Sequence, residues 1–94
     1  MPIGESTSVV RNDSIPTGEI DGELVALDLD SGHCFGMDRI GSTIWQIAAE
    51  PITIGAIADE LVARHDVDRA RCVADILPFI EQLLAEGLLR QLPA

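Results

Sequence analysis

Residues 26–38 of the chain are ALDLDSGHCFGMD, and this stretch decides the fold. With the two-residue period of a β-strand, one face carries Val25, Leu27 and Leu29, and the other carries Ala26, Asp28 and Asp30. Residues 30–32, Asp-Ser-Gly, have the composition of a tight turn in which glycine supplies a positive φ. Residues 33–37 form the returning strand, so the stretch predicts a β-hairpin. Gly36 inside that strand indicates a bulge or a close approach of another backbone.

The residues before the hairpin predict one more strand. Residues 8–10, Ser-Val-Val, are β-prone, whereas residues 12–18 hold Asn, Asp, Ser, Pro and Gly and are typical of a loop. The sheet expected from this pattern is three-stranded and antiparallel. Residues 1–8 are expected to be a flexible tail and residues 9–92 a single domain.

The residues after the hairpin predict three helices, at about 39–49, 53–65 and 69–86. Asp38 and Thr53 are expected N-caps, Pro51 ends the first helix and Gly87 ends the last. The first helix is expected to bury a stripe that begins at Ile40. Pro78 should kink the last helix on its polar face. An apolar tail, residues 88–92, can dock on the core. The predicted fold class is therefore α+β, with the sheet followed by the helices.

Composition excludes several functions. The 94 residues carry sixteen acidic against six basic side chains, a formal net charge of −10, which opposes nucleic-acid binding and favours a basic peptide or protein partner. No apolar run is long enough to span a membrane, and the first residues do not form a secretory signal. Cys34 and Cys72 do not make a disulfide framework, so we expect reduced thiols and a cytoplasmic location.

The last predicted helix has more apolar surface than one neighbour would cover. Its apolar side chains span an arc of roughly 160°, whereas a surface helix buries a stripe a little over about 100° wide. Two explanations remain open: the helix packs against two neighbours, or one edge of the arc lines a groove. The candidate groove edge carries Asp68, Cys72, Asp75 and Phe79.

The returning strand of the hairpin is a second candidate binding feature. An edge strand exposes unpaired N–H and C=O groups, and His33–Met37 has neither the Pro nor the Lys that commonly protects such an edge. An extended peptide could pair there by β-augmentation. Alternatively the edge is short and twisted, or a second copy covers it in a weak dimer.

These residues in this order resemble the PqqD-like domain, also called the RiPP recognition element, which serves ribosomally made peptide natural products. The family pattern is a hairpin of the form LD–turn–G–x–x–(F/Y)–G–(L/M)–(N/D), followed by a helix containing G–x–x–(I/L)–W. Here the pattern corresponds to residues 27–38 and 41–45, and the ending Glu86-Gly87-Leu88-Leu89 is also similar. The resemblance covers about residues 9–89. It is greatest to the discrete leader-binding proteins of lasso-peptide biosynthesis.

The resemblance implies a winged helix-turn-helix fold that binds the leader segment of a precursor peptide as an added strand along residues 33–37. It implies that the bound precursor is presented to a leader peptidase and a macrolactam cyclase. The implied peptide-binding residues lie on the returning strand and the last helix: His33, Cys34, Phe35, Gly36, Met37, Asp68, Cys72, Asp75, Ile76 and Phe79. For Asp68, a helix-capping role is an equal alternative.

We therefore expect a non-enzymatic protein without cofactor or metal. The spacing of its His and Cys residues matches no zinc pattern, and no oxyanion site accompanies them. Three rivals remain: a winged-helix DNA-binding regulator, a PqqD-type chaperone serving a radical enzyme, and a dimerisation domain without a groove. The DNA-binding rival is disfavoured because the middle helix offers only Arg64 for base contacts.

Overall fold

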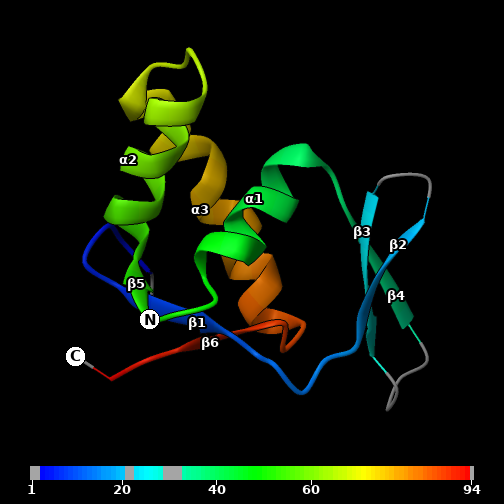
Figure 1. Cartoon of the computed structure of the whole chain (residues 1–94). Coiled ribbons are helices and arrows are strands. Elements are labelled where there is room, and N and C mark those ends of the chain that lie inside the picture. The colour runs from blue at the N-terminus through cyan, green and yellow to red at the C-terminus, as the bar shows by residue number, and fades with distance from the viewer. Residues whose placement is uncertain (1–2, 21–22, 29–32, 94) are drawn as a thin grey trace.

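The computed structural model describes residues 3–20, 23–28 and 33–93; the side chains of Ile20, Asp28, His33 and Phe35 also lie outside the described part. Two small sheets accompany three helices (Figure 1). The elements in chain order are β1 (Ser8–Arg11), β2 (Thr17–Ile20), β3 (Glu23–Asp28), β4 (His33–Met37), α1 (Arg39–Ile47), β5 (Ile52–Thr53), α2 (Ile54–Arg64), α3 (Arg69–Ala85) and β6 (Leu89–Gln91). The α+β class is confirmed, and the predicted turn at residues 30–32 lies outside the described residues.

The prediction of one sheet that precedes all the helices was wrong. One sheet has the order β5-β1-β6 and the other the order β2-β3-β4, all pairs antiparallel. The segment Thr17–Ile20, which we expected to begin as loop, is the third strand beside the hairpin. Its residues carry no strand period, so its conformation follows from pairing with β3.

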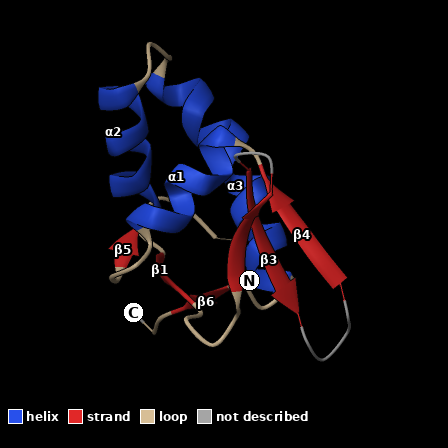
Figure 2. Ribbon diagram, turned by 45° about the vertical axis from the view of Figure 1, so that its right-hand side comes forward, coloured by secondary structure: helices blue, strands red, loops and turns tan. Residues whose placement is uncertain are grey.

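The strand β1 belongs to the other sheet because its side chains complete the core beneath the helices. Val9 is fully buried and pairs with Ile52 on one side and with Gln91 on the other. The apolar tail was expected to dock on the core, and β6 does so by pairing with β1, where Arg11 pairs with Leu89. In Figures 1 and 2 this sheet runs beneath the helices while the β2-β3-β4 sheet stands beside them.

The helices begin and end where local hydrogen bonds dictate. The carboxylate of Asp38 accepts from the N–H of Gly41 over 2.8 Å, and the hydroxyl of Thr53 accepts from the N–H of Ala56 over 3.2 Å. At the end of α3, Gly87 has a φ of 78°. The N–H of Gly87 donates to the carbonyl of Leu84 and that of Leu88 to the carbonyl of Leu83, which is a Schellman motif. The expected caps at Asp38 and Thr53 and the stop at Gly87 are confirmed.

The core lies between the helices and both sheets. Its largest fully buried side chains are Val9, Met37, Ile44, Ile54, Ile57, Leu61, Ile80, Leu83, Leu88 and Leu89.

Pro78 lies inside α3 at an exposed position, as expected from its place on the polar face of the helix. No helix within the described residues has both the length and the apolarity that crossing a membrane requires.

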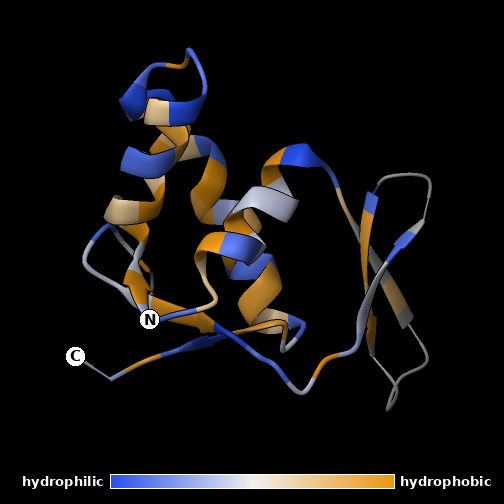
Figure 3. Cartoon of the chain, in the orientation of Figure 1, coloured by the Kyte–Doolittle hydropathy of each residue, from blue (hydrophilic) through white to orange (hydrophobic). Residues whose placement is uncertain are grey.

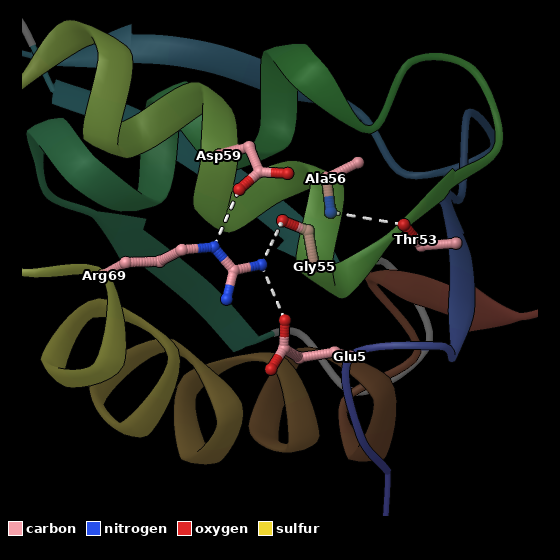
Figure 4. A network of polar contacts seen from close by, with 6 residues as sticks. All are labelled: Glu5, Thr53, Gly55, Ala56, Asp59 and Arg69. Carbon is pink, nitrogen blue, oxygen red and sulfur yellow. Dashed lines mark hydrogen bonds and ion pairs between the residues drawn. The ribbon is translucent and has the colours of Figure 1, made fainter.

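A polar network joins the N-terminal segment to α2 and α3 (Figure 4). The guanidinium of Arg69, at the start of α3, contacts the carboxylate of Glu5 at 2.6 Å and that of Asp59 at 2.7 Å. The backbone carbonyl of Glu5 accepts from the N–H of Gly55 over 2.9 Å. These two carboxylates raise the pKa of Arg69. Residues 3–7 thereby lie against the beginning of α2.

Candidate functional site: a free strand edge and an apolar pocket

The strand β4 is an edge strand, because β3 pairs with it on one side and no described strand lies on the other (Figure 2). The ladder register determines which backbone groups face that open side. The N–H of Leu27 donates to the carbonyl of Pro16, so Leu27 faces β2 and its neighbours Ala26 and Asp28 face β4. Their partners Phe35 and His33 face back toward β3.

It follows from this alternation that Cys34 and Gly36 direct their N–H and C=O groups away from β3. Cys34 is opposite Leu27 and Gly36 is opposite Val25, and these are the pairs without mutual hydrogen bonds. Two donors and two acceptors are thus available at the edge for another strand. Both residues are exposed.

An apolar pocket of about 200 Å³ lies where α1, α2 and α3 meet. Cys72, Asp75 and Ile76, all expected site residues, lie in its wall on α3, and Cys72 and Ile76 are buried. Arg71 and Asp75 form an exposed ion pair at 3.7 Å on the same side of the helix. The lining residues are Ile40, Leu61, His65, Val67, Arg71, Cys72, Asp75 and Ile76.

Two residues of this lining, Ile40 and Val67, were not expected as site residues from the sequence. Ile40 was expected in the buried stripe of the first helix, but its side chain is 36% exposed and forms part of the pocket. Val67, 46% exposed, comes from the turn between α2 and α3. Ile40 and Val67 are the exposed large hydrophobic residues within the described part of the chain. The sequence signal for an exposed Val67 is its position as an apolar residue between two aspartates, Asp66 and Asp68.

Phe79 connects α3 to the end of β4 through Gly41. A Cβ atom at Gly41 would lie 2.8 Å from Cζ of Phe79 and 3.3 Å from Cβ of Met37. The ring of Phe79 is half-buried and Met37 is buried, so both expected site residues meet at the first turn of α1. The small size of Gly41 is what permits this contact.

Asp68 is the N-cap of α3. Its carboxylate accepts from the N–H of Arg71 over 3.1 Å, and the side chain is exposed beside the pocket. The structure therefore supports the capping alternative for this residue. The side chains of His33 and Phe35, two other expected site residues, lie outside the described part, although their backbones belong to β4.

Burial shifts the pKa of one titratable group in the pocket, the thiol of Cys72. Removal from water raises the pKa of the Cys72 thiol, and the neighbouring carboxylate of Asp75 raises this pKa further. The raised pKa favours the neutral form of the Cys72 thiol, which forms an apolar part of the pocket wall.

Comparison with known proteins identifies the family. The family model for coenzyme PQQ synthesis protein D (PqqD) matches residues 23–89, from the first residue of β3 to the first residue of β6. The chain belongs to the PqqD family. The matched region includes β4, the residues that line the pocket, and Phe79.

Two solved structures share the fold of this PqqD domain. TbiB1 in complex with the TbiA(beta) leader peptide is 32% identical, with a TM-score of 0.76 over 90% of this chain and 99% of that chain. A lasso peptide synthetase B1 complexed with the leader peptide is 22% identical, with a TM-score of 0.74 over 90% of this chain and 98% of that one. No curated protein sequence matches the chain.

Proposed function

We propose that this PqqD-family protein binds the leader segment of a ribosomally made precursor peptide as an added strand along β4. The observation that carries the proposal is the free edge of β4, at which Cys34 and Gly36 direct two N–H donors and two carbonyl acceptors outward. Backbone pairing at such an edge contributes affinity with little demand on sequence. The likeness to TbiB1, whose structure includes a leader peptide, supports the same reading.

Side-chain specificity in this proposal comes from the space beside α3. Successive side chains of an extended peptide point to opposite faces, so every second one would point from β4 toward the helices. The pocket bounded by Ile40, Val67 and Ile76 offers an apolar surface for such side chains. The carboxylate of Asp75 at its rim could accept hydrogen bonds from the leader or pair with its basic groups.

We further propose that the protein is non-enzymatic and presents the bound precursor to a leader peptidase and a macrolactam cyclase in the cytoplasm. TbiB1, a leader-peptide complex 32% identical to this chain, is matched over almost its full length, which supports the leader-binding role. The lasso pathway rests on the resemblance of the sequence to the leader-binding proteins of lasso-peptide biosynthesis. We also propose that the fold is a winged helix-turn-helix. In this proposal α2 and α3, which flank the turn at residues 65–68, are its two helices, and the β2-β3-β4 sheet is the wing. A PqqD-type role beside a radical enzyme is the alternative.

The DNA-binding rival is opposed by the surroundings of the basic residues. Arg64 on α2 lies 3.5 Å from the carboxylate of Glu60, and Arg69 is held between Glu5 and Asp59. With a net charge of −10, the chain repels phosphates.

Binding of a fluorescein-labelled TbiA(beta) leader peptide, followed by anisotropy, tests the proposal. We expect saturable binding, and weaker binding to a scrambled peptide of the same composition. Equal binding of the two peptides would overturn strand-specific recognition. Light scattering with and without the peptide checks for a weak dimer through β4, which the leader should dissociate because both use one edge.

A further inference from the structure

The face of the β2-β3-β4 sheet that points away from the helices carries an unexplained apolar row. Val25 on the central strand is flanked by Gly18 on β2 and by Gly36 on β4. Val25 and Leu27 are only half-buried, whereas Ala26 and Met37 of the opposite face are 1% exposed. Figure 3 shows the hydrophobic character of β3. The sheet therefore leaves apolar side chains uncovered on its outer face.

Glycine on both sides of Val25 makes this face a shallow groove. A Cβ atom at Gly18 or at Gly36 would meet nothing within 4 Å, so neither glycine is required by close packing. Next to this row is a hollow of about 300 Å³ to which Val25, Leu27 and Cys34 contribute. The hollow reaches β4 at Cys34, which lies on the edge strand.

The register of β4 connects this groove to a bound strand. An added strand would hydrogen-bond to Cys34 and Gly36, and directly paired residues point to the same face of a sheet. The peptide residues opposite Cys34 and Gly36 would therefore place their side chains on the outer face, beside Val25 and Leu27. The side chain opposite Gly36 meets no Cβ atom and can lie across the glycine onto Val25.

We propose that the peptide bound at β4 is recognised on both faces of the sheet. On the outer face, a large apolar side chain opposite Gly36 covers Val25. This inference rests on the proposed leader binding and adds a second specificity surface to the pocket beside α3.

A matched pair of glycine variants tests this inference. Gly36→Val fills the groove at the edge that binds the peptide, and Gly18→Val adds the same side chain across Val25 on the opposite edge strand. Both variants keep every backbone donor and acceptor, and both positions have room for the new side chain. With the labelled TbiA(beta) leader peptide, we expect Gly36→Val to raise the Kd about tenfold and Gly18→Val to leave it nearly unchanged.

The outcomes separate this inference from the proposed function. If the wild-type protein binds the peptide and Gly36→Val binds it equally well or better, outer-face recognition is wrong while leader binding stands. Failure of the wild-type protein to bind contradicts the proposed function itself.

Discussion

Cζ of Phe79 lies 2.8 Å from the position that a Cβ atom would occupy at Gly41. This relationship holds α3 against the first turn of α1, next to Met37 at the end of the proposed peptide-binding strand. A methyl group at residue 41 would force the ring to move, although the ring is the far end of a rotatable side chain. The packing of these two residues therefore links the helical half of the site to its strand half.

A double-mutant cycle measures this link. In the wild-type background, Gly41→Ala should change stability little, because the gain of about 1 kcal/mol in helix propensity is offset by displacement of the Phe79 ring. In a Phe79→Ala background the same change should stabilise by about 1 kcal/mol. Urea denaturation of the four proteins gives both values, and additive effects would contradict the contact.

The exposed rim of the pocket should matter for binding and not for folding. Ile40→Asp and Val67→Asp each place a charge where we expect apolar peptide side chains, so each should weaken leader binding about tenfold. Both residues are exposed, so thermal unfolding should stay close to that of the wild type. Ala63→Asp, on an exposed position of α2, is the matched control and should bind normally. Normal binding by both rim variants would remove the pocket from the site.

Two variants of Asp68 separate its role as the N-cap of α3 from a contact with the leader. Asp68→Ala removes the acceptor for the N–H of Arg71 and should destabilise the protein by about 1 kcal/mol. Asp68→Asn keeps a good N-cap and removes the charge, so it should be nearly as stable as the wild type. Titration of Asp68→Asn with the labelled peptide then isolates the charge: weaker binding assigns Asp68 to the site, and unchanged binding leaves it a cap alone.

The two thiols should react at different rates, and only one should respond to the peptide. Cys34 is exposed on the edge strand, whereas Cys72 is buried with a raised pKa. Iodoacetamide should therefore modify Cys34 several times faster, as mass spectrometry of timed samples would record. Saturating leader peptide should protect Cys34, because an added strand covers β4. If Cys34 is alkylated equally fast with and without the peptide, the peptide does not bind along β4.

The raised pKa of Cys72 also predicts a change of stability at alkaline pH. The folded protein retains the thiol proton at pH values where the unfolded chain loses it, so stability falls as pH rises above the ordinary thiol pKa. Below that pH the thiol is neutral in both states and contributes no pH dependence. Urea midpoints from pH 7 to pH 10 should decline more steeply for the wild type than for Cys72→Ala; parallel curves would contradict this assignment.

Local patterns determined much of this protein from the sequence. The strand at residues 33–37 follows from the alternation and turn composition before it. The caps at Asp38 and Thr53 and the glycine at residue 87 follow from hydrogen bonds made within one helical turn. The resemblance to the PqqD family also rested on such short-range order, and the family match confirms it.

Only the tertiary structure decided which strands pair and which faces are buried. Residues 17–20 became a strand because β3 supplies a partner, and β1 joined β5 and β6 because Val9 completes the core. The alternation in β3 predicted two faces but not that Ala26 would pack inward while Val25 and Leu27 stay half-exposed. The physical reason is that helix caps and turns are made by residues near each other in sequence. Strand pairing and burial depend instead on distant partners, whose positions no local pattern contains.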